Sequence, residues 1–121
     1  MLLASHLINE PDSLPLLAAV RRHLSAGGRA IVECYSAGWF DTVADGSGGT
    51  LGEVEISLSE VARDRDLLSA VIGRSRGREW VRAFTARRLD QAGLVDLLAK
   101  AGLRFRGWCA STDTWFSADL P

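Results

Sequence analysis

Hydrophobic and polar positions follow one another along the first third of the chain in a pattern that predicts strand, helix and strand. The apolar run at residues 1–8 predicts a strand that enters a loop. Residues 12–24 carry leucine and valine at helical spacing above a polar face, and we expect Gly27-Gly28 to end this helix. Residues 29–35 are rich in β-forming side chains. This order is typical of a parallel βαβ unit.

The middle of the chain has weaker signals. Residues 36–52 contain five glycines and predict a loop. Residues 53–59 alternate between apolar and polar side chains as a half-buried strand does, although a helix that begins at Ser57 is a competing interpretation. Residues 67–86 predict an antiparallel pair of strands that turns near residues 73–77.

The last third of the chain predicts a helix followed by a hairpin. Asp90 is expected to cap the helix, which has an apolar stripe through Leu94, Leu97 and Leu98, and Gly102 is expected to end it. Two β-rich stretches then follow, at residues 103–110 and residues 114–118. The short polar segment between them predicts a terminal β-hairpin.

Composition bounds the class of protein. With 121 residues and 47% hydrophobic content, residues 1–121 are expected to form a single domain with its own core. The net charge of −1 gives no global field that would attract nucleic acid or an anionic membrane. Cys34 and Cys109 lie far apart and outside any metal-ligand spacing, so we expect no metal site and a reducing, cytoplasmic environment. The start of the chain has no pattern of a signal peptide or membrane span.

Three passages, taken in order, resemble the second half of a class I S-adenosylmethionine-dependent methyltransferase. The first two read Leu-Leu-Ala-Ser-His-Leu-Ile-Asn-Glu at residues 2–10 and Leu-Ser-Ala-Gly-Gly-Arg-Ala-Ile-Val-Glu at residues 24–33. The third runs from Phe84 through Arg-Arg-Leu-Asp at residues 87–90 to Leu-Leu-Ala-Lys-Ala-Gly-Leu at residues 97–103. The resemblance implies an α/β fold, namely a partial Rossmann-like methyltransferase sheet with antiparallel C-terminal strands. It covers most of residues 1–121 and matches the C-terminal half of such a domain.

The chain departs from that family in one respect. The family's glycine-rich cofactor loop and the acidic residue that closes its second strand have no counterpart in the sequence. Gly46-Ser47-Gly48-Gly49 cannot substitute, because a strand rather than a helix is expected to follow it. The resemblance therefore implies methyl transfer to a small-molecule acceptor that is weak or absent in this chain alone. The alternative is a non-catalytic interaction or dimerisation module that pairs through its exposed first strand.

Candidate site residues follow from the rule that ligands of open α/β sheets lie beyond the carboxyl ends of the strands. After the first strand, Ser5, His6 and Leu7 are expected to bind the cofactor, which the resemblance identifies as S-adenosylmethionine. His6 is also a candidate base near neutral pH, with an ordinary loop histidine as the alternative. Glu33, near the end of the second strand, is the other candidate catalytic residue, and a structural ion pair is its alternative role.

The acceptor pocket is expected next to the second strand. Tyr35, Trp39 and Phe40 form an aromatic group suited to line a substrate pocket, although aromatic residues at a strand end also serve as core. We expect a small-molecule substrate and neither nucleic acid nor membrane as partner. A homodimer and a separate N-terminal half both stay open as protein partners.

Arginine is concentrated in one part of the chain. Alternate positions there would share one strand face, with Trp80 and Phe84 interleaved. Such a face suits nucleic-acid phosphate, an acidic substrate or simply solvent. The arginines of this group are Arg74, Arg76, Arg78, Arg82, Arg87 and Arg88.

Overall fold

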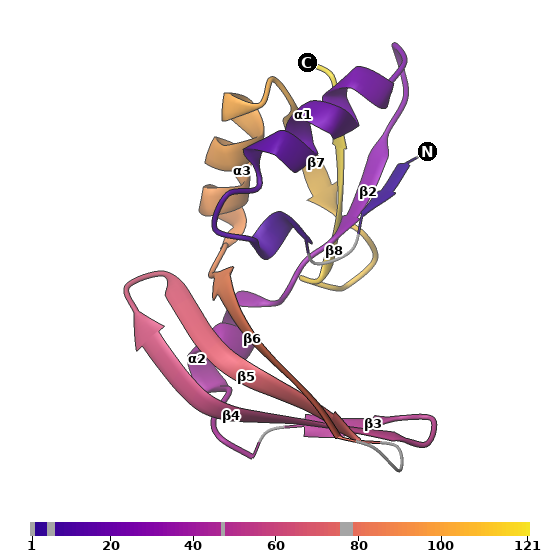
Figure 1. Cartoon of the computed structure of the whole chain (residues 1–121). Helices are drawn as coiled ribbons and strands as arrows, with labels where there is room; N and C mark the ends of the chain where they lie inside the picture. The colour runs from indigo at the N-terminus through magenta and orange to yellow at the C-terminus, as the bar shows by residue number, and fades with distance from the viewer. Residues whose placement is uncertain (1, 5–6, 47, 76–78) are drawn as a thin grey trace.

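The computed structural model describes residues 2–4, 7–46, 48–75 and 79–121. Its strands form two four-stranded sheets that lie at opposite ends of the molecule (Figure 1). We call the sheet that contains both the first and the last strand sheet A, and the other sheet B. The chain leaves sheet A after residue 33 and returns from sheet B after residue 87.

Sheet A has the predicted strand, helix and strand at its start and the predicted hairpin at its end. Its strand order is β1 (Leu2–Ala4), β2 (Ala30–Glu33), β8 (Trp115–Asp119) and β7 (Arg104–Trp108). β1 and β2 are parallel, whereas the β2–β8 and β8–β7 pairs are antiparallel. This arrangement confirms the predicted partial Rossmann-like sheet with antiparallel C-terminal strands.

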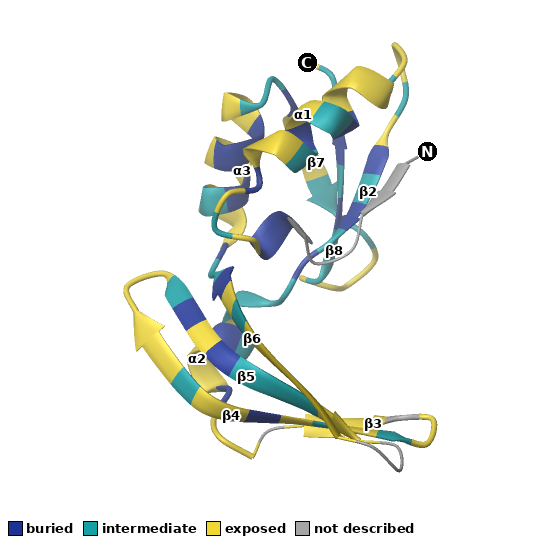
Figure 2. Cartoon of the chain, viewed as in Figure 1, coloured by how far each residue is buried: buried dark blue, intermediate teal, exposed yellow. Residues whose placement is uncertain are grey.

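Two helices cover one face of sheet A. They are α1 (Leu14–His23) and α3 (Gln91–Lys100). On the facing strands, Val32 is paired with Phe116, and both side chains are buried, because cross-strand partners share one face of a sheet. Leu17 of α1 and Leu94 of α3 are fully buried in the same cluster. Figure 2 shows these buried positions gathered between the helices and the sheet.

The predicted start of α3 was correct, whereas the predicted end of α1 was not. Asp90 caps α3 as predicted, because its Oδ1 accepts a hydrogen bond from the Gly93 backbone N–H at 2.8 Å. The prediction that Gly27-Gly28 ends α1 was wrong. The helix ends at His23, where Leu24 adopts an extended backbone and packs against the core. Gly27, at φ +78°, instead forms part of the turn that leads into β2.

Sheet B is an antiparallel meander. Its strands follow one another in space as in sequence: β3 (Gly48–Leu51), β4 (Val54–Asp64), β5 (Leu67–Ser75) and β6 (Glu79–Arg87). The alternation before Ser59 and the predicted antiparallel pair are therefore confirmed. The competing helix start at Ser57 was wrong, because this residue lies inside β4.

The predicted loop at residues 36–52 was wrong. A short helix, α2 (Ala37–Thr42), begins directly after Ser36, whose Oγ accepts a hydrogen bond from the Trp39 N–H at 3.2 Å. β3 then pairs with β4 at close range. A Cβ added at Gly48 would lie 2.0 Å from the Ile56 carbonyl oxygen, so only glycine fits there.

A second core lies between α2 and sheet B. Phe40 of α2 and Val43, which directly follows this helix, pack with four buried side chains of β4, β5 and β6. Figure 2 shows that buried positions on sheet B are confined to the end near α2. The sheet B members of this core are Leu58, Leu68, Ala70 and Ala86.

Within the described ranges, no helix is long and apolar enough to cross a membrane. The same residues contain no group of three or more His, Cys, Asp or Glu side chains arranged to hold a metal ion.

Candidate functional site

The candidate site lies at the carboxyl ends of the parallel strands β1 and β2. A 3-10 helix, η1 (Leu7–Asn9), begins three residues after the end of β1, and Glu33 is the last residue of β2. Leu7 is the first residue of η1, and its predicted contact with a cofactor stays a prediction. Ser5 and His6 lie outside the described residues, so their predicted contacts with a cofactor stay predictions.

Asn9 ties three segments together at this end of sheet A. It is 1% exposed, and its Nδ2 donates a hydrogen bond to the Arg87 carbonyl at 2.9 Å. Its Oδ1 accepts a hydrogen bond from the Tyr35 backbone N–H, also at 2.9 Å. The chain after β1, the chain after β2 and the end of β6 are thus joined by one buried amide. Sequence reasoning treated Asn9 only as part of a loop and missed this role.

The three predicted pocket aromatics come together. The rings of Tyr35 and Trp39 are stacked, with centroids 4.5 Å apart and 14° between their planes. The ring of Phe40 stands edge-on to both, at 5.9 Å and 5.1 Å. Phe40 is buried in the second core, whereas Tyr35 and Trp39 are half-buried and pack against it. The group therefore serves partly as core and partly as surface beside β2.

Burial and nearby charged side chains shift the pKa of the Tyr35 hydroxyl. Burial and the negative charge of Glu33 raise the pKa of Tyr35, and Glu10 adds to the shift. The positive charge of Arg74 on β5 opposes it. Two carboxylates, Glu33 and Glu10, and one guanidinium, that of Arg74, are thus close enough to the carboxyl end of β2 to shift the pKa of Tyr35. The predicted catalytic role of Glu33 stays a prediction.

Cys34, directly after β2, is a buried thiol. Its Sγ lies 3.7 Å from the Asp113 carbonyl oxygen, to which it donates. Burial, followed by the negative charges of Asp113 and Glu33, raises the pKa of Cys34 from 9.0 to about 12. The thiolate is the reactive form of cysteine, so a thiol held protonated at this position is a poor nucleophile.

This pKa shift predicts that stability falls as the pH rises from about 9 toward about 12. In the unfolded chain the thiol ionises at its ordinary pKa, whereas in the folded chain it keeps its proton, so unfolding releases a proton in this window. Urea unfolding at about pH 8 and about pH 10.5 should therefore show a smaller loss of stability in Cys34→Ala than in the wild type. Equal losses in the two proteins would contradict the shift. Tyr35 is present in both, so its own shift cancels in the comparison.

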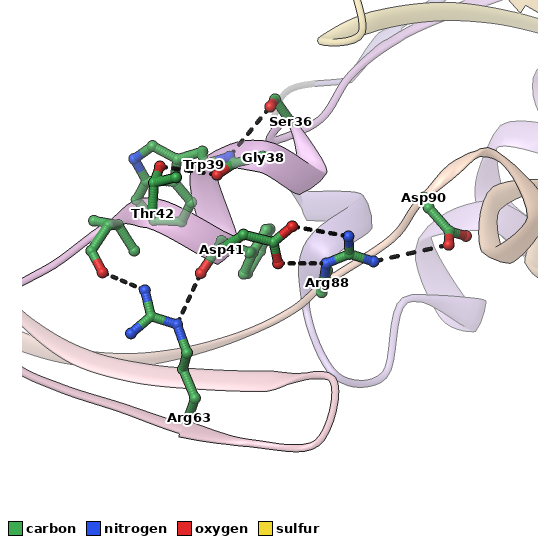
Figure 3. A network of polar contacts seen from close by, with 10 residues as sticks. Ser36, Gly38, Trp39, Asp41, Thr42, Arg63, Arg88 and Asp90 are labelled. Atoms are coloured by element: carbon green, nitrogen blue, oxygen red, sulfur yellow. Dashed lines mark hydrogen bonds and ion pairs between the residues drawn. The ribbon is translucent and has the colours of Figure 1, made fainter.

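Polar contacts from distant segments hold α2 in place (Figure 3). Arg63 of β4 donates from Nε to the Phe40 carbonyl at 2.9 Å and from a second guanidinium nitrogen to the Val43 carbonyl. Arg88 forms a two-bond ion pair with Asp41, at 2.9 and 3.0 Å, and lies 3.7 Å from Asp90. These contacts fix the helix that carries Trp39 and Phe40.

The predicted arginine face is present in the described part of the chain. Arg74 is paired with Trp80 and Arg82 with Ile72, so these side chains share one face of sheet B. Arg87 and Arg88 are instead engaged in ion pairs with Asp66 and Asp41. Arg76 and Arg78 lie outside the described residues.

Comparison with known proteins identifies the fold. No protein-family model and no curated protein matches the sequence. Among solved structures, an S-adenosylmethionine-dependent methyltransferase from Clostridium acetobutylicum matches 98% of this chain at a TM-score of 0.68 and 18% identity. The fold is that of an S-adenosylmethionine-dependent methyltransferase. Two further solved methyltransferases match most of this chain.

The first of these is a sugar N-methyltransferase from Streptoalloteichus, with a TM-score of 0.55 and 16% identity over 91% of this chain. The second is an amino pentose methyltransferase from Micromonospora echinaspora, solved with S-adenosylmethionine bound, with a TM-score of 0.56 and 18% identity over 96% of this chain. The chain spans only about half the length of these solved methyltransferases, between 50% and 57%. The predicted match to one half of a methyltransferase domain is thus confirmed at the level of fold.

Proposed function

We propose that this chain forms the acceptor side of a methyltransferase that uses S-adenosylmethionine and methylates a small molecule. The observation that carries the proposal is the position of Tyr35, Trp39 and Glu33 at the carboxyl end of β2, within a methyltransferase fold. In open α/β sheets this is the edge where ligands bind. The acceptor would lie against the half-buried faces of Tyr35 and Trp39, with Phe40 behind them.

An amine is the acceptor group that the site suits best. Two of the matched structures are described as a sugar N-methyltransferase and an amino pentose methyltransferase. Glu33 supplies a carboxylate that could hold an ammonium group and take one of its protons, which frees the nitrogen lone pair. The amine nitrogen then forms the new N–C bond while the S–C bond of the sulfonium breaks and leaves a neutral thioether. The negative charges of Glu33 and Glu10 around Tyr35 favour a cation at this position.

S-adenosylmethionine, when bound, supplies an electrophilic methyl group on a sulfonium. The described residues fit only one part of its site, because η1 and Asn9 border the carboxyl end of β1 while the glycine-rich loop has no counterpart in the sequence. Ser5, His6 and Leu7 are the residues proposed to contact the cofactor. The remaining contribution of this chain is alignment of the acceptor, which is the main requirement of an in-line displacement. We therefore propose weak or absent turnover by these 121 residues alone.

A titration with S-adenosylmethionine followed by NMR of the ¹⁵N-labelled chain tests this proposal. We expect weak binding, with shift changes confined to residues 5–10 and residues 33–40. S-adenosylhomocysteine, which lacks the methyl group, should perturb the same amides. Shift changes elsewhere, or none at millimolar ligand, would contradict a cofactor-facing edge. Low-micromolar affinity with turnover would overturn the claim that the chain is incompetent alone.

The position of β1 favours a second candidate function. β1 is the end strand of sheet A and has β2 as its neighbour in the described sheet. An open strand edge can pair with another chain, either a second copy or a separate N-terminal half. The chain would then act as an interaction module. NMR line widths that grow with protein concentration would support self-association, whereas constant widths at high concentration would count against it.

A further inference from the structure

The end of sheet B that α2 leaves uncovered contains a groove. Its volume is about 580 Å³, within the range of roughly 300–1,000 Å³ found for small-molecule sites. It is lined by apolar residues of β4, β5 and β6 together with two arginines and a tryptophan. The lining residues are Val54, Ile56, Ile72, Arg74, Trp80, Val81 and Arg82.

Strand register explains how charged and apolar side chains meet in this groove. Arg74 of β5 lies between Ile56 of β4 and Trp80 of β6, with which it is paired on either side. Arg82 is paired with Ile72 in the same way. Cross-strand partners point to one face, so two guanidinium groups stand beside a strip of apolar surface.

The two guanidinium groups are uncommitted within the described residues. Arg63, Arg87 and Arg88 each bind a carbonyl or a carboxylate. In the part of the chain that the structure describes, neither Arg74 nor Arg82 forms an ion pair. Exposed arginines attract anions, and a planar guanidinium can bind two oxygens of a carboxylate or phosphate at once.

Aromatic and apolar surface is also exposed here. Trp80 is 52% exposed, which is unusual for a side chain of this size. The indole ring offers a flat surface for stacking next to the arginines. The groove is therefore suited to a ligand that has both a flat apolar body and a negative charge.

The groove lies near the candidate acceptor site. Ile72 lines the groove and also packs against the second core, as Tyr35 and Trp39 do. The positive charge of Arg74 is close enough to lower the pKa of the Tyr35 hydroxyl, against the larger effects that raise it. A ligand that reaches from the carboxyl end of β2 along this face of sheet B would thus meet Arg74, Arg82 and Trp80.

We propose that this groove binds the non-reacting end of the acceptor, and that this end carries an apolar ring and an anionic group, a phosphate or a carboxylate. Arg74 and Arg82 would bind the anion and Trp80 would stack on the ring. The inference rests on the proposed function, because it extends the acceptor site beyond Tyr35. Arg74 and Arg82 would then be residues that determine acceptor specificity.

Binding of three small probes tests the groove without any methyl transfer. Phenyl phosphate and phenylacetate carry a ring and an anion of each kind, and benzyl alcohol is a neutral analogue. The indole N–H signal of Trp80, assigned with Trp80→Phe, reports binding by NMR. We expect one or both anions to shift this signal, with affinity that falls as salt is added, and benzyl alcohol to bind at least about tenfold more weakly.

Charge-neutralising variants complete the test. Arg74→Gln and Arg82→Gln should each weaken binding of the anionic probe by about tenfold, because each removes a charge-assisted hydrogen bond. Arg22→Gln, at an exposed arginine of α1 outside the groove, is the matched control and should bind as the wild type does. Equal binding of benzyl alcohol, unchanged affinity in both groove variants, or no shift of the Trp80 signal would each overturn the proposal. The cofactor titration perturbs other amides, so either proposal can fail while the other stands.

Discussion

Replacement of Phe116 by alanine should lower the free energy of unfolding by about 3–5 kcal/mol, as expected for a large aromatic side chain removed from a core. Phe116 on β8 is fully buried beneath the two helices of sheet A. Its ring centroid lies 5.6 Å from that of Phe105 and 6.1 Å from that of Trp108. The cavity would open against both rings and against Val32 on the neighbouring strand. Urea unfolding followed by circular dichroism measures the change.

Phe84→Ala is the matched control for this prediction. Phe84 is half-buried on β6 and packs at the margin of the second core, so its removal should cost only about 1–2 kcal/mol. A Phe116→Ala protein whose stability is no lower than that of Phe84→Ala would show that the core of sheet A is not the main source of stability.

Urea unfolding followed at the tryptophan side chains tests the domain organisation. We propose that residues 1–121 unfold as one cooperative domain, although their buried side chains form two clusters. Trp108 and Trp115 report on sheet A, and Trp39 and Trp80 on sheet B. Coincident transitions from both pairs would support one domain. Two separate transitions would assign each sheet its own folding unit.

Sheet A could be predicted from the sequence because its signals are local. The apolar spacing of α1, the Asp90 cap of α3 and the β-rich residues 29–35 each specify an element within about ten residues of chain. Their order then restricts the topology, because a strand, helix and strand in succession favour a parallel pair.

The segment between the sheets could not be predicted, because its structure depends on distant partners. α2 has only six residues, too few to be stable as an isolated helix. It is held by Arg63 and Arg88, which lie 23 and 47 positions from the residues that they bind. The glycines that suggested a loop include Gly48, which is required by the close approach of β3 to β4.

The candidate site was predicted in part. The rule that ligands bind at the carboxyl ends of strands selected Glu33 and the aromatic group, and the structure brings Tyr35, Trp39 and Phe40 together. Asn9 was missed because an Asn followed by Glu-Pro-Asp is a common turn sequence. Its partners lie 26 and 78 positions away, and no local pattern indicates them.

Asn9→Ala should lower the free energy of unfolding by about 2–3 kcal/mol, because it leaves the Tyr35 N–H and the Arg87 carbonyl without their buried partner. The loss should also loosen the junction that places the aromatic group at the carboxyl end of β2. Amide hydrogen exchange at Tyr35 should therefore accelerate more than the change in global stability accounts for. Urea unfolding and exchange measured by NMR provide the two values.

Two further variants separate the two hydrogen bonds of Asn9. Glu10→Ala changes the exposed neighbouring residue and should alter stability by no more than about 0.5 kcal/mol. Asn9→Asp keeps an oxygen that can accept from the Tyr35 N–H, but near neutral pH it places a carboxylate oxygen against the Arg87 carbonyl. We expect Asn9→Asp to be destabilised while the Tyr35 amide stays protected relative to its global stability. Fast exchange at Tyr35 in Asn9→Asp would instead mean that the bond to Arg87 holds the junction, because that bond alone is lost in this variant.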